Sequence, residues 1–462
     1  MAFKPEPDVN PNGGIVDPPA IVRYILKQVM SRIADPKARA RKRAKAETAR
    51  IKAGEPHRIE YFHQPDDPYS HLAAQAAVQL ATRYDVELVP HLMGPTGGAS
   101  QPEAEKLAHW ARRDAASIAP HYGLEFPADA PVTPEAHHID LAVSALEAAE
   151  PSEFPVLAAE LGTALWSGDE STLATHAGEL RQPPLTSSIL ERGNARIAEL
   201  GHYSGAMFHY GGEWFWGADR LFYLEQWLRD LGACKDLSLP FICPRPPIDV
   251  SGIDASALTL DFYPSLNSPY TSIIYDPTIA MVKECGIQLQ HKPVLPMLMR
   301  GLPVPRKKGA YIVFDTKREA EHLGVPFAPL VFPVGEPTRN IYSLFAFARA
   351  HDRETDLLSA ALRLAFAEGV GLHRKKGLRM AVEQAGLDWE EAQKHLGNSG
   401  WQEPTALNQQ EMTEGLGLWG VPSYRLRGGE GPDGPYEDLC VWGQDRLWLI
   451  AAEIRRRARG MP

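Results

Sequence analysis

A serine followed by a proline stands where a predicted strand gives way to a predicted helix, in the run Asn267-Ser268-Pro269-Tyr270. Serine is a preferred N-cap residue, and proline suits the first helical position because its missing N–H would have no partner there. The Ser268 hydroxyl would then lie at the positive end of a helix dipole, which favours a bound anion. Taken alone, these four residues are better explained as a plain helix cap, which contributes ~1 kcal/mol.

Two later motifs change that balance. Gly420-Val421-Pro422-Ser423-Tyr424 precedes the final predicted hairpin. Trp442-Gly443-Gln444-Asp445-Arg446-Leu447 forms a turn that opens the last predicted helix. Asp445 suits a helix N-terminus without any ligand, and contact with a ligand is an equal alternative.

Together these motifs resemble the kappa-class glutathione transferase and 2-hydroxychromene-2-carboxylate isomerase family, a branch of the DsbA-like thioredoxin folds. The resemblance runs in order through residues 258–454. The other matching motifs are Asp261-Phe262-Tyr263, Pro305-Arg306-Lys307 with Tyr311, Asp315 with Arg318, and Gly324-Val325-Pro326-Phe327.

The resemblance implies a thioredoxin core with an inserted helical bundle that binds glutathione as its cofactor. Ser268 falls at the family's catalytic serine, which faces the glutathione sulfur. Pro422 falls at the family's cis-proline, and the cis form costs far less before proline than before other residues. The implied glutathione-binding residues are Pro269, Tyr270, Lys307 (with Lys308 adjacent), Val421, Pro422, Gln444 and Asp445. Because the thiolate is the nucleophile, a hydroxyl donor and a helix N-terminus would both promote the reaction.

The same order of motifs occurs earlier in the chain. It opens with Glu60-Tyr61-Phe62-His63 and Asp67-Pro68-Tyr69, and it closes with Trp214-Phe215-Trp216-Gly217-Ala218-Asp219-Arg220-Leu221. A repeat of ~200 residues is too long for a solenoid unit and indicates a duplicated domain. Here Asp67 stands at the serine position and Ala206 at the position of Pro422. An ionised Asp67 would repel a thiolate, so we expect a non-catalytic copy that acts as an intramolecular partner in place of a homodimer mate.

We therefore predict an α/β protein with two tandem thioredoxin-like domains, each with an inserted helical bundle of the DsbA/kappa-like kind. The predicted divisions are an N-terminal tail and basic helix (1–56), a degenerate domain (57–232), a linker (233–257) and the active domain (258–462). Strands are expected at 58–63, 86–92, 206–210 and 213–216 in the first repeat, and at 258–263, 287–291 and 423–426 in the second. A last helix is expected at 445–459.

The N-terminal segment joins an apolar helical spacing to a basic run. The apolar residues are Ile21, Tyr24, Ile25, Val29 and Ile33, and the basic residues are Lys37, Arg39, Arg41, Lys42, Arg43 and Lys45. An anionic partner would explain the basic run. The interspersed alanines and Glu47 instead favour a solvated helix face.

Composition narrows the function classes. The 48 Lys and Arg against 58 Asp and Glu give a net charge of −10, which argues against a nucleic-acid binder. No apolar run approaches membrane-spanning length and no secretory signal opens the chain, so we expect a cytoplasmic protein without a membrane partner. The four cysteines include no C-x-x-C pair and are expected to be reduced thiols. The adjacent His137 and His138 lack further ligands at metal spacing, so no metal is expected.

The expected function is a glutathione-dependent isomerase or transferase that acts on a small conjugated or aromatic electrophile, as 2-hydroxychromene-2-carboxylate isomerase does. A thiol-disulfide oxidoreductase is the alternative enzyme, but the missing C-x-x-C pair disfavours it because exchange needs a resolving thiol. A non-catalytic glutathione-binding or scaffold protein is the alternative from another class.

Overall fold

The computed structural model describes residues 15–177, 183–432 and 434–460. It divides into two compact units. The first unit comprises residues 40–246, and the second unit combines residues 247–462 with the segment that precedes residue 40.

The first unit is built on a four-stranded mixed sheet. Its strands are β1 (His57–His63), β2 (Val86–Leu92), β3 (Met207–Tyr210) and β4 (Glu213–Trp216), in the spatial order β2-β1-β3-β4. Only β1 and β2 run parallel, and α3 (Pro68–Arg83) provides the crossover that parallel strands need. The helix α9 (Gly217–Asp230) follows β4 directly. These elements lie where the sequence predicts them.

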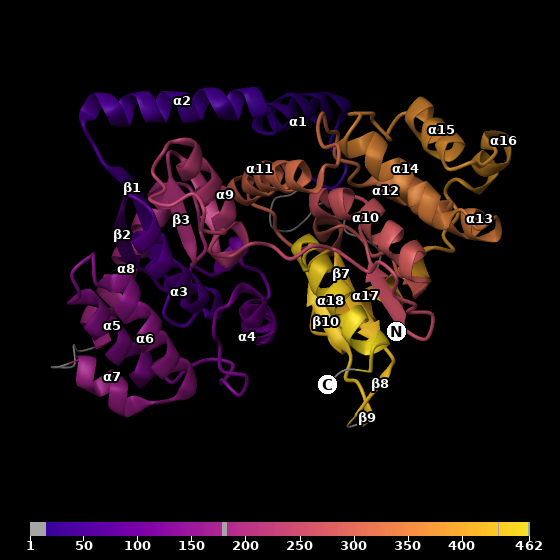
Figure 1. Ribbon diagram of the computed structural model, residues 1–462. Coiled ribbons are helices and arrows are strands. Elements are labelled where there is room, and N and C mark those ends of the chain that lie inside the picture. Colours follow the sequence, from indigo (N-terminus) through magenta and orange to yellow (C-terminus); the bar gives the residue numbers. More distant parts are fainter. Residues whose placement is uncertain (1–14, 178–182, 433, 461–462) are drawn as a thin grey trace. The chain divides into compact units, whose positions relative to one another are not determined.

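A helical insert separates β2 from β3 in the first unit (Figure 1). Its α-helices are α4 (Ala104–Ile118), α5 (Ala136–Glu147), α6 (Phe154–Ser167), α7 (Glu170–Ala177) and α8 (Pro183–Glu199). Short 3-10 turns form η1 (Gly98–Ser100) and η2 (Ala119–Tyr122).

The second unit contains a sheet with the same strand order and strand directions. Its strands are β5 (Thr259–Tyr263), β6 (Gln288–His291), β7 (Ser423–Arg427) and β10 (Leu439–Trp442), in the order β6-β5-β7-β10. Again only β5 and β6 run parallel, joined by α10 (Pro269–Cys285). The hairpin before β10 carries a separate ribbon, β8 (Glu430–Gly431) with β9 (Gly434–Pro435), and the chain continues through η6 (Gln444–Arg446) into α18 (Leu447–Ala458).

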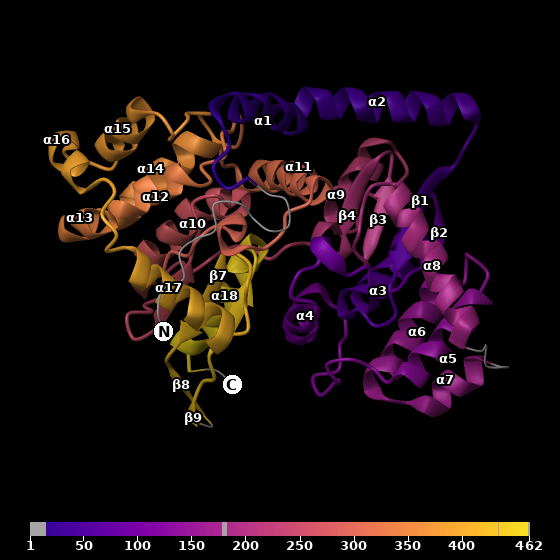
Figure 2. The same ribbon diagram turned by 180° about the vertical axis from the view of Figure 1, so that it is seen from behind.

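The insert of the second unit lies between β6 and β7 and is drawn in orange in Figures 1 and 2. Its larger helices are α11 (Arg306–Leu323), α12 (Glu336–Ser343), α13 (Phe345–Ala350), α14 (Glu354–Phe366), α15 (Lys375–Gln384) and α17 (Gln402–Gln410). Shorter pieces are η3 (Met297–Arg300), α16 (Trp389–Ala392), η4 (Gln393–His395) and a π-helical turn, η5 (Glu411–Gly415).

Matching aromatic pairs fill the two cores. Tyr61 stacks on Phe208 with ring centroids 4.8 Å apart, and Phe262 stacks on Tyr424 at 4.9 Å. In each unit the pair joins the first strand to its antiparallel neighbour. The observed mixed α/β architecture is the one expected for the second repeat.

The N-terminal segment forms two helices, α1 (Ala20–Ile33) and α2 (Pro36–Ala53). α1 packs on the second unit, and the division between the units falls inside α2, after Arg39. Among the described helices, none combines the length and the apolar character that crossing a bilayer requires.

Candidate functional site

Ser268 caps the helix α10. Its Oγ accepts a hydrogen bond from the Thr271 N–H at 3.1 Å, and Pro269 occupies the first helical position. The same hydroxyl donates to the carbonyl oxygen of Val421 at 3.3 Å. The Val421–Pro422 peptide bond is cis. The structure therefore brings Ser268 next to Val421 and Pro422, although Ser268 and Val421 are 153 residues apart in the sequence.

The backbone around this contact is held by four donors. Each of the four consecutive carbonyl oxygens from Trp419 to Pro422 accepts one hydrogen bond. The donors are Arg300 Nη2 to Trp419 (2.7 Å), Ser423 Oγ to Gly420 (2.8 Å), Ser268 Oγ to Val421 (3.3 Å) and Gly443 N to Pro422 (2.9 Å). The segment is thus fixed from η3, α10, β7 and the turn after β10.

The N–H of Val421 makes no hydrogen bond within the described residues. Val421 keeps 9% of its surface exposed, as does Ser268. A donor of this kind beside a rigid carbonyl is suited to pair with an extended peptide, in the way that a sheet edge pairs with an added strand. The Ser268 hydroxyl and the first turn of α10 face the same place, so an anion there would meet a hydroxyl donor and a positive dipole end.

Two tryptophans pack against this backbone. The rings of Trp419 and Trp442 lie 4.7 Å apart. A Cβ atom added at Gly420 would lie 2.0 Å from Trp442 Nε1. Only glycine fits here without movement of the indole or of the loop.

Substituting Gly420 is therefore expected to disturb the loop. Gly420→Ala should destabilise the second unit by roughly 1–3 kcal/mol, the usual cost of overpacking a core. It should also weaken any ligand that pairs with Val421. Chemical denaturation followed by tryptophan fluorescence tests the first effect. Wild-type stability in the variant would show that Trp442 can move aside freely.

The other residues implied at this site are placed as follows. The Tyr270 hydroxyl donates to Asp315 Oδ2 at 2.9 Å, so it is turned towards α11. Lys307 and Lys308 lie in the first turn of α11. Lys307 is exposed, whereas burial lowers the pKa of Lys308 to about 8.

Gln444 and Asp445 both have buried side chains, with 3% and 7% of their surfaces exposed. Gln444 Nε2 donates to Glu319 Oε2 at 2.7 Å, and its Oε1 has no hydrogen-bond partner among the described residues. Asp445 folds back over Gly443, where an added Cβ would meet its Oδ1 at 2.5 Å. Both side chains offer acceptors, which suits an ammonium group, but neither lies open on the surface.

The first unit has a different arrangement at the matching position. Asp67 caps α3 and accepts hydrogen bonds from Ser70 N (3.0 Å) and Ser70 Oγ (2.8 Å). A Cβ added at Gly205, which matches Val421, would lie 2.8 Å from Gln64 Cβ. Ala206, matching Pro422, has a φ of +56°. The backbone at Gly205 therefore lies close to Gln64 and to the Ser70 hydroxyl and has no room for a side chain.

The expectation that Asp67 is fully ionised requires a correction. Burial raises the pKa of Asp67 from 3.8 to about 7, although hydrogen bonds from Ser70 and Tyr69 oppose this shift. At neutral pH a large fraction of this carboxyl is therefore protonated. Repulsion of a thiolate is weaker than the sequence suggests, and the tight loop is the stronger obstacle to a ligand.

This raised pKa predicts a pH-dependent stability difference. An acid with a higher pKa in the folded state stabilises the fold fully at pH values below its unfolded pKa, and that stability is lost as the pH rises through the folded value. For Asp67, a rise of about three units corresponds to roughly 4 kcal/mol between pH 4 and pH 8.

The measurement compares wild type with Asp67→Asn by hydrogen exchange over residues 57–92. The comparison is necessary because burial lowers the pKa of His63 to about 3 and that of His71 to about 4, which acts in the opposite direction. We expect the protection of wild type relative to the variant to fall steadily over this pH range. A difference that does not change with pH would contradict the assignment.

Each sheet holds one carboxylate whose role the sequence motifs do not indicate. Asp261 on β5 is fully buried and accepts two hydrogen bonds from Arg427, at 2.9 and 2.8 Å. Glu60 on β1 occupies the matching position and accepts two from Arg196, at 2.8 and 2.9 Å. An acidic residue between apolar residues in a predicted buried strand was the available signal, because such a group needs a partner.

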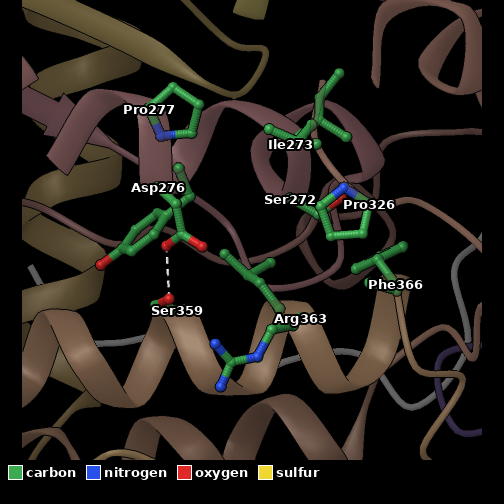
Figure 3. Close-up of a pocket in the computed structure, with 12 residues that line it drawn as sticks. Ser272, Ile273, Asp276, Pro277, Pro326, Ser359, Arg363 and Phe366 are labelled. Carbon is green, nitrogen blue, oxygen red and sulfur yellow. Dashed lines mark hydrogen bonds between the residues drawn. The ribbon is translucent and has the colours of Figure 1, made fainter. Parts of the chain in front are cut away.

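A separate hollow lies between α10, α14 and the turn at Val325-Pro326 (Figure 3). It has a volume of about 430 Å³, part of it open to solvent. Asp276 Oδ1 accepts from Ser359 Oγ at 2.6 Å on one wall. Pro277 lies inside α10 and has no N–H to donate to the Ile273 carbonyl. Ser268 is not among the lining residues, so this hollow is distinct from the contact described above.

The cysteines do not form a redox pair. All four are free thiols, and burial raises the pKa of Cys243 and Cys285. Among the described residues, no group of three or more His, Cys, Asp or Glu side chains is arranged to hold a metal ion.

Comparison with known proteins finds a family match within the second unit. Residues 259–455 match the family of DSBA-like thioredoxin domains. Similar solved structures include 2-hydroxychromene-2-carboxylate isomerase, with 18% identity over 44% of this chain and 96% of that chain and a TM-score of 0.36. Another is a probable DsbA oxidoreductase from Streptomyces coelicolor, with 17% identity over 44% of this chain and 91% of that chain and a TM-score of 0.34. No curated protein sequence matches the chain. Residues 259–455 form a DsbA-like thioredoxin domain.

Proposed function

We propose that this protein is a glutathione-dependent isomerase or transferase whose active site lies at the N-terminus of α10. The observation that carries the proposal is the contact between Ser268 Oγ and the Val421 carbonyl, 3.3 Å apart, beside a Val421 N–H that has no partner among the described residues. A tripeptide paired with Val421 would bring its central thiol towards the Ser268 hydroxyl.

The chemistry follows from the groups at this position. The Ser268 hydroxyl would turn from Val421 and donate to the sulfur, while the helix dipole favours the thiolate. The thiolate would add to a conjugated double bond, forming a C–S bond as the displaced electron pair moves to the conjugated acceptor. Rotation about the resulting single bond and expulsion of the thiolate would complete an isomerisation. A transferase would keep the C–S bond. The carbanion formed by the addition would then take up a proton, or the adduct would expel a leaving group together with its electron pair.

The binding groups follow the same proposal. Val421 would offer its backbone to the tripeptide, with Pro422 next to it, and Pro269 and Tyr270 would form the helix start below the sulfur. Lys307 or Lys308 would attract a carboxylate, and Gln444 with Asp445 would accept from the γ-glutamyl ammonium group. Gln444 Oε1 has no hydrogen-bond partner among the described residues, which supports the proposal that Gln444 accepts from this ammonium group.

We also propose that residues 57–232 are a degenerate thioredoxin-like copy that serves as an intramolecular partner. The shared strand order and directions support this, as do matching polar contacts. Tyr69 donates to Asp114 at 2.7 Å in the first unit, and Tyr270 donates to Asp315 at 2.9 Å in the second. Replacing residues 40–246 with a flexible linker tests the partner role. Full activity and solubility of the remainder would rule it out.

Thiol-disulfide exchange is less well supported. The α10 start carries Ser268, Pro269, Tyr270 and Thr271, with no cysteine at either position that an exchange reaction requires.

Calorimetric titration with glutathione tests the main proposal. Wild type should bind one equivalent, and Gly420→Ala should bind at least about tenfold more weakly because the loop carrying Val421 is displaced. Gly205→Ala is the matched control, since it crowds the corresponding loop of the first unit. Equal weakening by both variants, or no binding by wild type, would overturn the proposed site. Turnover is then measured with 2-hydroxychromene-2-carboxylate and with an activated haloarene, which separate isomerase from transferase activity.

A further inference from the structure

The helix α1 packs on the second unit with its polar side. Arg23 is 6% exposed and donates to the carbonyls of Phe332 and Val334, both at 3.0 Å. Lys27 Nζ donates to the Gly369 carbonyl at 2.8 Å, and Ser31 Oγ accepts from the Leu330 N–H at 3.4 Å. These residues recur at every fourth position and so define one helix face. That face is fixed to the insert of the second unit.

The opposite side of α1 is apolar and open. Ile21 is 63% exposed, Tyr24 60%, Ile25 53% and Val29 47%. These positions recur at the spacing of a single helical stripe. Isolated exposed apolar residues are common on proteins, but a continuous stripe of them marks an interaction surface. The sequence spacing alone would have placed these residues in the core.

Charge identifies the kind of surface that this stripe fits. Residues 15–53 contain 11 Lys or Arg and 3 Asp or Glu, a net charge of +8 in a chain whose total is −10. Arg32 and Lys37 are the exposed basic residues that follow the stripe within the second unit, and the basic run continues along the sequence with the exposed Arg41, Lys42 and Lys45. Two copies of this segment would repel each other, which argues against pairing with a second copy. Nucleic acid would satisfy the charges but not the apolar side chains.

We infer that α1 is an interfacial helix that binds reversibly to the surface of an anionic lipid bilayer. The apolar stripe would enter the boundary between headgroups and acyl chains, with Tyr24 at headgroup level, and the basic residues would attract the lipid phosphates. A helix of 14 residues is about 21 Å long, too short to span a hydrocarbon core of about 30 Å. The inference differs from the expectation of no membrane partner, which considered spanning segments only.

The experiment is flotation of the full chain with lipid vesicles. Wild type should float with vesicles of phosphatidylcholine that contain about 30% phosphatidylglycerol, an anionic lipid, and should remain unbound with phosphatidylcholine alone. Raising the salt concentration should release it from the anionic vesicles. The triple variant Ile21→Gln, Ile25→Gln, Val29→Gln should lose at least about tenfold in bound fraction. The variant Lys37→Gln, Arg41→Gln, Lys42→Gln should also show a lower fraction bound to the anionic vesicles.

Val156→Gln with Leu407→Gln is the matched control, because these side chains are 57% and 59% exposed on other helices. It should bind like wild type. Wild type that fails to float with anionic vesicles overturns the inference, as does a triple variant that binds normally. A concentration-dependent dimer of wild type that the triple variant abolishes would assign the stripe to self-association instead. Glutathione titration of the triple variant should be unchanged, which separates this surface from the proposed active site.

Discussion

Replacing Ser268 with alanine is expected to lower turnover ~10- to 100-fold while glutathione still binds. A hydrogen bond to a charged acceptor contributes about 1.5–3 kcal/mol, and each ~1.4 kcal/mol corresponds to one pKa unit or a tenfold change in rate. The pKa of the bound glutathione thiol should therefore rise by about one to two units in Ser268→Ala. The helix dipole remains in the variant, so part of the thiolate stabilisation should persist.

The measurement combines initial rates with ultraviolet detection of the bound thiolate across a pH series. Loss of the helix cap should also cost ~1 kcal/mol of stability, which denaturation reports separately. Ser272→Ala is the control, since Ser272 lies one turn further along α10 and donates to the Pro269 carbonyl at 2.6 Å rather than to the loop. A variant at position 268 that keeps both the wild-type rate and the wild-type thiol pKa would remove Ser268 from the mechanism.

Asp261→Ala is expected to destabilise the second unit by about 1.5–3 kcal/mol, the usual contribution of hydrogen bonds that involve a charged group. The carboxylate is fully buried on β5 and holds Arg427 through two hydrogen bonds. Lys292 lies 3.6 Å away and Arg425 4.0 Å away. Without Asp261, Arg427 would lose both of these acceptors, whereas Lys292 and Arg425 would keep their ion pairs with Glu411. The loop that carries Val421 follows into β7 beside them, so glutathione binding should weaken as well.

Chemical denaturation of Asp261→Ala and Asp438→Ala tests this expectation. Asp438 also binds Arg425, at 2.7 Å, but it is 35% exposed, so its removal should cost less than about 1 kcal/mol. Asp261→Asn keeps the shape of the side chain, so its loss of stability should lie between those of the two alanine variants. Equal stability of the two alanine variants would show that solvent reaches Asp261 and screens its charge.

Local pattern was sufficient to predict most of the strands and the helix starts that follow Asp67 and Ser268 in the two units. The predicted strands at 86–92 and 213–216 coincide with β2 and β4, and helices begin next to Asp67 and Ser268 as expected. These features depend on neighbouring residues: alternating burial, a capping side chain and a proline at the first helical position.

What the sequence could not supply depends on distant contacts. The raised pKa of Asp67 follows from desolvation of its carboxyl in the folded protein, which no local motif encodes. The inward turn of Gln444 depends on Glu319, 125 residues away in the chain. The apolar residues of α1 face outward because Arg23 and Lys27 find carbonyl acceptors more than 300 residues later. The role of Arg300 likewise depends on the Trp419 carbonyl.

The four carbonyls from Trp419 to Pro422 belong to the main chain, so no mutation can delete them. Three of the groups that donate to them are the side chains of Arg300, Ser423 and Ser268, so substitution there changes this hydrogen bonding directly, whereas Gly420→Ala acts by displacing the loop itself. Variation that retunes ligand preference should accumulate at these positions rather than within the loop. A library randomised at Arg300 and Ser423 is thus a more direct route to new substrates than one randomised at residues 419–422.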